Sequence, residues 1–97
     1  MSLTSKQRAF LRSMSNTLDT IIYIGKEGIT PNIVKQVYDA LEARELIKCS
    51  VQNSAPMDAR EACQVLCGQT GAEPVQCIGG RFVIYRQSRE KQKIVLE

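Results

Sequence analysis

The sequence predicts an α/β (α+β) sandwich, in which three helices pack on a four-stranded mixed sheet within one domain of residues 1–97. The length of 97 residues lies within the usual range of about 50 to 250 for a single domain. Hydrophobic residues make up 43% of the chain and charged residues 24%, which is typical of a folded globular protein. The spacing of apolar residues switches between helical and strand-like periods in the order α-β-α-β-α-β-β, with no internal repeat or linker.

The first helix is predicted to begin at Thr4, because Thr4 and Gln7 match the S/T-x-x-E/Q capping box. Its apolar side is expected to consist of Phe10, Leu11, Met14 and Leu18. Arg8 and Arg12 fall on the opposite side, one helical turn apart, where they face solvent.

A strand and the second helix come next. The run Ile21–Ile24 is β-branched and aromatic and is ended by a glycine, which favours a strand. Thr30 followed by Pro31 predicts a helix start, and this helix continues to about Arg44. Its solvent face is expected to carry the acids Asp39, Glu42 and Glu45.

The run Leu46–Val51 alternates and predicts a half-buried strand, with Ile47, Cys49 and Val51 on one face and Lys48 and Ser50 on the other. Residues 53–56 read as a turn and the start of the third helix. The inward side of that helix is expected to hold Ala59, Ala62, Cys63, Val65 and Leu66. Gly71 is expected to end it as a left-handed cap.

The last elements form a hairpin. The apolar runs Val75–Ile78 and Phe82–Tyr85 flank Gly79, Gly80 and Arg81, and a glycine pair between such runs indicates a tight turn. From about residue 87 the chain is polar and basic, and we expect it to be loosely ordered. Whether residues 94–96 pack back onto the domain stays open.

The side-chain inventory argues against an enzyme. The chain has no histidine, which removes the commonest general base and metal ligand, and no pair of carboxylates is arranged for acid–base work. We therefore predict no catalytic residue, no cofactor, no metal and no small-molecule substrate. The N-terminus carries no signal pattern and no apolar run approaches the length of a membrane span, so a cytoplasmic protein without membrane contact is expected.

Four cysteines remain, and they are best explained by packing. Only Cys63 and Cys67 lie close in sequence, with a spacing that differs from the C-x2-C pairs of zinc sites. We expect Cys49, Cys63, Cys67 and Cys77 to be buried structural thiols, with a metal site or a redox role as the alternatives.

Charge is distributed unevenly along the chain. Residues 1–26 and residues 81–97 each carry a net charge of +3, whereas residues 27–80 carry −3. If the fold brings the two ends together, one face becomes positive, as in proteins that bind nucleic acid. The alternative is that each end is an ordinary solvated surface.

The segment Gly25-Lys26-Glu27-Gly28 links a strand to a helix. Glycines allow close backbone approach, exposed N–H groups can meet phosphate oxygens, and Lys26 adds a charge, as in the GXXG loop of KH domains. A plain tight turn is the alternative, since Gly68–Gly71 has the same spacing at a helix end. Tyr23 and Tyr85 could each stack on a base or fill the core.

Five blocks of sequence resemble the CRM domain (chloroplast RNA splicing and ribosome maturation), and more narrowly its free-standing bacterial YhbY-type form. They are Leu3–Arg12, Ile24–Thr30, Ala40–Lys48, Thr70–Ala72 and Phe82–Arg86, and the resemblance spans about residues 2 to 90. It implies a single RNA-binding domain. Bacterial members associate with precursors of the large (50S) ribosomal subunit, and plant organelle relatives serve group II intron splicing.

The resemblance also implies an RNA-binding surface and partners. Its loop falls on Gly25, Lys26, Glu27 and Gly28, and its basic surface draws on Lys6, Arg8, Arg12, Arg81 and Arg86. The expected partner is 23S rRNA in 50S precursors, with ribosomal proteins as further partners, and the protein is expected to be a monomer. Glu27 departs from the pattern, because an acid inside the loop is expected to weaken its contact with phosphate.

A second function remains open from the residues themselves. The acidic middle segment could make the chain a protein-interaction module that reaches the ribosome through a ribosomal protein or assembly factor, with Asp39, Glu42 and Glu45 as the contact.

Overall fold

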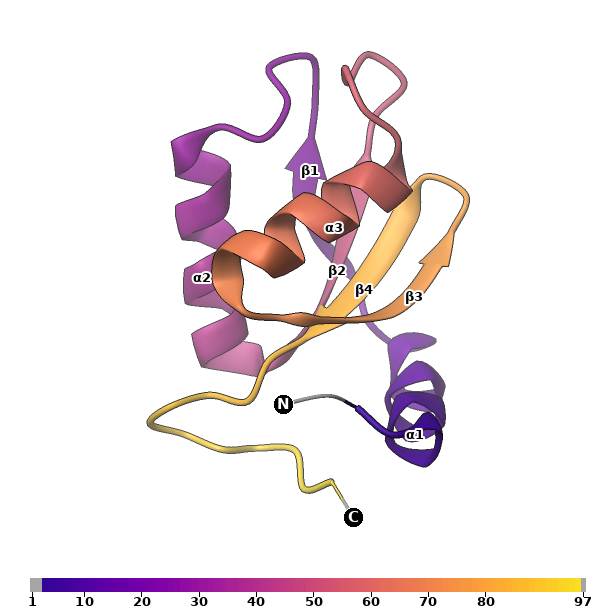
Figure 1. The fold of residues 1–97 in the computed structure, drawn as a ribbon, viewed down its shortest axis with the longest axis vertical. Coiled ribbons are helices and arrows are strands. Elements are labelled where there is room, and N and C mark those ends of the chain that lie inside the picture. The colour runs from indigo at the N-terminus through magenta and orange to yellow at the C-terminus, as the bar shows by residue number, and fades with distance from the viewer. Residues whose placement is uncertain (1–2, 97) are drawn as a thin grey trace.

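The computed structural model describes residues 3–96 and confirms the predicted order of three helices and four strands (Figure 1). The elements are α1 (Ser5–Ser15), β1 (Thr20–Ile24), α2 (Pro31–Arg44), β2 (Leu46–Val51), α3 (Ala59–Thr70), β3 (Glu73–Ile78) and β4 (Arg81–Tyr85). The strands form one mixed sheet in the order β1-β2-β4-β3. β1 and β2 are parallel and connected through α2, whereas β4 runs antiparallel to both β2 and β3.

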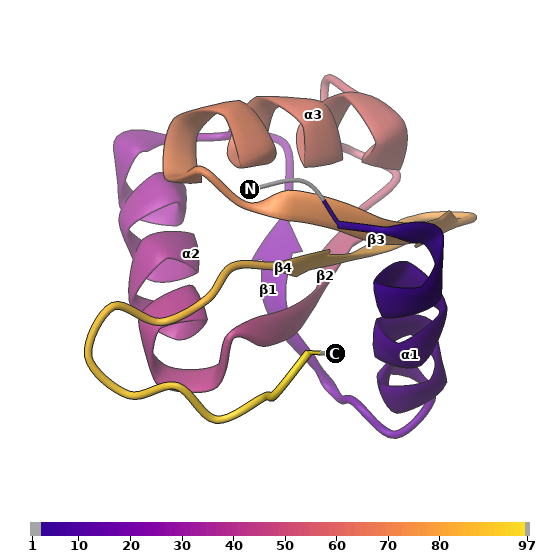
Figure 2. The same cartoon turned by 60° about the horizontal axis from the view of Figure 1, so that its bottom comes forward.

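The sheet separates two hydrophobic cores. Figure 2 shows α2 and α3 on one side of the sheet and α1 with the C-terminal segment on the other. The larger core, under α2 and α3, includes Ile22, Ile24, Val37, Leu41, Ile47, Cys49, Ala62, Cys63, Leu66, Phe82 and Ile84. The smaller core, under α1, consists of Leu3, Leu11, Leu46, Val75, Val83 and Tyr85. Neighbouring residues of β2 and β4 enter opposite cores because successive side chains of a strand point to opposite faces.

Helix ends follow the expected capping chemistry in most places. The Thr4–Gln7 capping box is present, Thr30 caps α2 by accepting from the N–H of Ile33, and Gly71 ends α3 with φ of 78°. The third helix begins later than predicted, since Asp58 accepts from the N–H of Glu61 and provides the N-cap. Residues 52–57 form a loop instead, which packs against the loop that follows β1.

Some expectations about burial are wrong. Phe10 is 48% exposed and Val65 is 42% exposed, although both were placed on inward helix faces. Within the described residues α1 contacts mainly β2 and β3, so only a narrow stripe around Leu11 and Ser15 is buried. Among the cysteines, Cys49 and Cys63 are buried as predicted, whereas Cys77 is exposed near the end of the edge strand β3.

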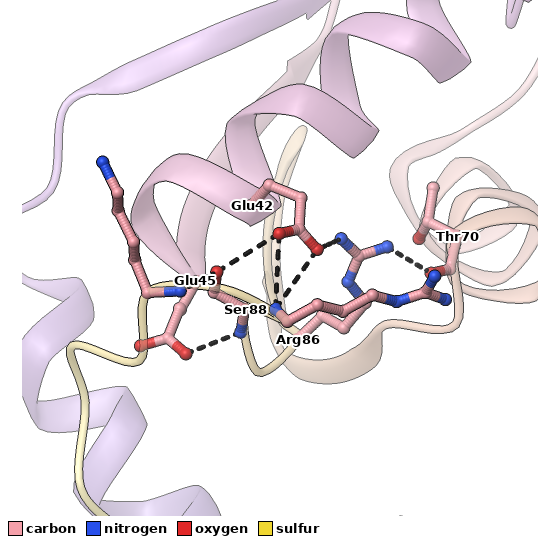
Figure 3. A network of polar contacts seen from close by, with 7 residues as sticks. Glu42, Glu45, Thr70, Arg86 and Ser88 are labelled. Carbon is pink, nitrogen blue, oxygen red and sulfur yellow. Dashed lines mark hydrogen bonds and ion pairs between the residues drawn. The ribbon is translucent and has the colours of Figure 1, made fainter.

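The C-terminal segment, expected to be loosely ordered, is bound along its backbone to the end of α2 (Figure 3). The carboxylate of Glu45 accepts from the N–H of Ser88 at 2.7 Å and from those of Lys93 and Ile94 at 2.6 and 2.7 Å. Ile94 and Leu96 then pack against the smaller core. The prediction of a loosely ordered segment is therefore wrong, because charge-assisted hydrogen bonds from its backbone N–H groups to the buried Glu45 carboxylate hold it in place.

Within residues 3–96, no helix is both long and apolar enough to cross a lipid bilayer.

Candidate nucleic-acid interface

The loop between β1 and α2 is a tight turn that presents two charged side chains. The N–H of Gly28 donates to the carbonyl of Gly25 at 2.9 Å, which closes a four-residue turn. Lys26 and Glu27 occupy its two central positions and are exposed. In the part of the chain that is described, no backbone hydrogen bond uses the N–H of Lys26 or Glu27. These two groups are therefore available to an anion, although Glu27 brings a negative charge to the same turn.

Gly28 is the glycine of this loop that the fold requires. Gly28 has φ of 71°, and a Cβ there would lie 3.1 Å from the Cγ of Pro56. A Cβ on Gly25 would lie 3.0 Å from the side-chain oxygen of Gln52. The N–H of Gln52 in turn donates to the carbonyl of Ile24 at 2.8 Å. The absence of a side chain at Gly28 thus allows Pro56 to pack closely against the loop, whereas a side chain at Gly25 would displace only the exposed end of Gln52.

Arg81 lies at the same end of the sheet as this loop. The parallel strands β1 and β2 both run toward that end, and β4 begins there, as Figure 1 shows. The hairpin is fixed to β2 by the N–H of Val51, which donates to the carbonyl of Gly80 at 2.7 Å. Arg81 is exposed as the first residue of β4.

The three cations of α1 do not lie in one place. Arg8 does not face solvent as predicted: it is half-buried, because its Nε donates to the carbonyl of Pro74 in β3 at 3.2 Å. Arg12 is exposed as predicted, one turn further along the same side. Lys6 instead borders a cleft with Phe10 and the C-terminal segment. The structure therefore directs Arg8 toward β3, leaves Arg12 exposed, and places Lys6 on the other side of α1.

A cation that the sequence analysis did not assign to the site, Lys48, lies beside Arg81. Both line a hollow of about 190 Å³ on the α1 side of the sheet, together with Asn16 at the end of α1 and Gln76 in β3. The alternation of β2 had put Lys48 on the face opposite Cys49, but only the sheet order β2-β4-β3 shows that Arg81 shares this face.

Arg86, in contrast, is not part of an exposed basic surface, and the prediction that it lies on one is wrong. Its side chain is only 10% exposed. Nη2 lies 2.5 Å from Glu42 Oε1, and Nη1 donates to the carbonyl of Thr70 at 2.9 Å (Figure 3). The guanidinium also lies 4.3 Å from the centre of the Tyr38 ring. Arg86 thus joins the end of β4 to α2 and α3.

The acidic surface expected on α2 is largely absent for the same reason. Glu42 pairs with Arg86, and Glu45 is fully buried. Burial would raise the pKa of Glu45, but the N–H groups of Ser88, Ile94 and Lys93 together lower it. Asp39 remains exposed and pairs with Lys35 at 3.1 Å. Two of the three acids assigned to a protein partner are therefore occupied within the chain.

Neither the cysteines nor the tyrosines form a chemical centre. The four thiols are free, and burial raises the pKa of Cys49 to about 12. Among residues 3–96, no group of three or more metal-ligating side chains comes together. Tyr85 is buried in the smaller core, whereas Tyr23, two residues before the loop, is 56% exposed.

Comparison with known proteins places this arrangement in a family. Residues 3–86 match the CRS1 / YhbY (CRM) domain. A Bacillus subtilis protein named "Probable RNA-binding protein YqeI" is 42% identical over 94 residues, which cover 97% of this chain and 98% of that protein. A Haemophilus influenzae protein named "RNA-binding protein" is 30% identical over 89 residues, which cover 92% of this chain and 90% of the relative.

The solution structure of the hypothetical protein SAV1595 from Staphylococcus aureus has the same fold, with a TM-score of 0.81 and 45% identity. The alignment covers 98% of this chain and 99% of that one, so it includes the loop, the hairpin and α1. The agreement in fold and in sequence over nearly the whole length shows that this protein belongs to the CRS1/YhbY (CRM) domain family.

Proposed function

We propose that this protein is a non-catalytic RNA-binding protein that binds structured rRNA during assembly of the large (50S) ribosomal subunit. Membership of the CRM family and the names of the two curated relatives support RNA as the partner. The finer part of the proposal, in which a cytoplasmic monomer binds 23S rRNA in 50S precursors, rests on the resemblance to the bacterial YhbY-type proteins.

The observation that carries the proposal is the exposed turn at Lys26 and Glu27, which shares one end of the sheet with Arg81. The available N–H groups of the turn and the ammonium of Lys26 can hold phosphate oxygens. Arg81, Lys48 and Arg12 supply further charge for the RNA backbone. Such contacts position a protein on RNA without reading bases, so selectivity should depend mainly on RNA shape.

The salt dependence of RNA affinity measures how many phosphates the protein contacts. If roughly 4 to 6 phosphates are neutralised, the log–log slope of affinity against salt should be about −3 to −5. The experiment compares the unmodified protein with Lys26→Ala on a structured fragment of large-subunit rRNA. Lys26→Ala should weaken binding and make the slope shallower by about 0.7 to 0.9, the contribution of one phosphate.

Lys35→Ala is the control, because it removes one exposed positive charge from α2, where Lys35 pairs with Asp39, and leaves the turn itself unchanged. It should leave the slope unchanged. A slope near zero for the unmodified protein would contradict RNA binding, and equal slopes for Lys26→Ala and Lys35→Ala would show that the loop makes no phosphate contact.

The ribosomal part of the proposal needs a separate test. The tagged protein should co-sediment with 50S precursors from cells, and brief RNase treatment should release it. An association that survives RNase would favour the alternative, in which a ribosomal protein or assembly factor holds this chain.

A further inference from the structure

The α1 side of the sheet is covered over only part of its area. Leu46, Val83 and Tyr85 lie beneath α1 and the C-terminal segment in the smaller core. Nearer the Gly25–Gly28 loop, one residue from each strand forms a row across the sheet, in the order Tyr23, Ser50, Arg81 and Ile78. The register defines this row, since Tyr23 pairs with Ser50, Ser50 with Arg81, and Arg81 with Ile78.

This row combines exposed apolar surface with unpaired positive charge. Tyr23 is 56% exposed and Ile78 is 66% exposed. Both lie on edge strands of the sheet, β1 and β3, where a further layer over this face would bury them. Arg81 stands between them, and Lys48 joins it in the hollow of about 190 Å³. Among the described residues, neither Arg81 nor Lys48 takes part in an ion pair. We call Tyr23, Lys48, Ser50, Ile78 and Arg81 the open sheet face.

The chemistry of the open sheet face fits one kind of occupant. A flat aromatic ring on a sheet is a platform on which a base can stack, and cations beside it neutralise the phosphates of the same strand. A base inside a duplex is stacked on both sides and cannot use such a platform. Tyr23 also lies only two residues before Gly25, so RNA held at Lys26 is already next to this ring.

We propose that the open sheet face binds an unpaired nucleotide of the RNA, with its base stacked on Tyr23 and its backbone held by Arg81 and Lys48. Arg81 is two strands away from Tyr23, about 10 Å at the normal strand spacing. The long side chain of Arg81 therefore reaches the phosphate of a nucleotide whose base covers Tyr23. This inference rests on the proposed function and adds a preference for RNA with unpaired bases over a continuous duplex.

The test uses the full chain and two RNAs of equal length and charge: a fully paired duplex, and the same duplex interrupted by a loop of unpaired nucleotides. Tyr23→Ala should weaken binding to the looped RNA about 5- to 10-fold, as expected for the loss of one base–aromatic stack, and leave duplex binding unchanged. Tyr23→Phe should retain the affinity, because the stacking ring remains. Phe10→Ala is the matched control, since it removes an exposed aromatic ring from the far side of α1.

A fluorescent base analogue, 2-aminopurine, placed in the loop gives a second readout. Its emission should change on binding of the unmodified protein and of Tyr23→Phe, but not of Tyr23→Ala. The inference is overturned if Tyr23→Ala weakens binding to both RNAs equally, or to neither. It is also overturned if sedimentation without RNA shows a dimer that Tyr23→Ala dissociates. Failure of the unmodified protein to bind either RNA would instead overturn the proposed function, and this inference with it.

Discussion

Arg86 at the end of β4 and Glu42 in α2 form an ion pair in which Nη2 and Oε1 are 2.5 Å apart, with both side chains mostly withdrawn from solvent. Removing one partner of such a pair leaves the other charge poorly solvated. Arg86→Ala should therefore lower the free energy of unfolding by about 2 to 4 kcal/mol, a little less than for a fully buried pair because Glu42 is 25% exposed. Urea denaturation followed by circular dichroism measures this loss.

Arg86→Lys keeps the charge but not the planar guanidinium that joins Glu42 and the carbonyl of Thr70. Its free energy of unfolding should therefore lie between those of the unmodified protein and Arg86→Ala. A double-mutant cycle with Glu42→Gln separates the pair from the other contacts of Arg86. A coupling energy near zero would mean that the ion pair does not stabilise the fold.

Glu45 gives stability a specific pH dependence. Burial raises its pKa, but the three N–H donors outweigh burial, so folding lowers the pKa of this carboxyl below its ordinary value of 4.5. A group whose pKa is depressed on folding contributes its full stability above the unfolded value and loses it as pH falls through the folded value. The free energy of unfolding should therefore decline below about pH 4.5 in step with release of the C-terminal segment.

Glu45→Gln tests this assignment. It should cost about 1 to 3 kcal/mol at pH 7, because an amide cannot satisfy all three donors, and the acid decline should become shallower. Hydrogen exchange at Ser88, Lys93 and Ile94 should speed up in this variant, whereas exchange within β2 follows only the global loss. Unchanged protection at those three amides would contradict the role of Glu45.

Local signals in the sequence predicted the helices and strands well. The features that the sequence analysis did not predict depend on contacts between distant residues. The Thr4 capping box, Thr30 before Pro31, and Gly71 each act within one helical turn, so a short window contains all their information. The fate of Glu45 depends on Ser88, 43 residues later. Periodicity shows which side of α2 faces the sheet, but not that the C-terminal segment returns to the end of this helix.

One clue to Glu45 is visible only in the structure. Its φ of 67° at the end of α2 is a conformation that favours glycine, yet this chain has a glutamate there. The strain of this backbone position is offset by the three N–H groups that the Glu45 carboxylate binds. Arg86 was misassigned in the same way, because a basic residue after a strand looks solvated until its distant partner is known.

The candidate site was predicted in part. The turn with Lys26 and the hairpin with Arg81 follow from local glycine patterns, and the structure places both at one end of the sheet. Lys48 was missed because its proximity to Arg81 depends on β4 lying between β2 and β3, an order that strand spacing along the chain does not fix.

The two Gly-x-x-Gly segments should respond oppositely to alanine. Gly28→Ala should cost about 1 to 2 kcal/mol, because its φ is 71° and its Cβ would press on Pro56. Gly68→Ala should stabilise the protein by about 0.5 to 1 kcal/mol, because Gly68 lies within α3 with open space around it. Thermal unfolding measured side by side on both variants checks the signs.

Only the first segment should matter for RNA. Gly68→Ala should bind the rRNA fragment with unchanged affinity and salt slope, because it lies on the side of the sheet opposite α1. A stabilising effect of Gly28→Ala would show that the turn adopts a different conformation from the one described.

Arg8 and Arg12 should separate binding from stability. Both are expected to contact phosphate, so alanine at either should make the salt slope shallower by about 0.7 to 0.9. Arg8→Ala should also cost about 0.5 to 1.5 kcal/mol, because its Nε donates to the carbonyl of Pro74. Arg12→Ala, at an exposed position, should change stability by about 0.5 kcal/mol or less.

Arg60→Ala controls for loss of charge alone, because Arg60 is an exposed arginine of α3, and it should leave the slope unchanged. If Arg60→Ala and Arg12→Ala weaken binding equally, α1 has no special role, because net charge alone then accounts for the affinity.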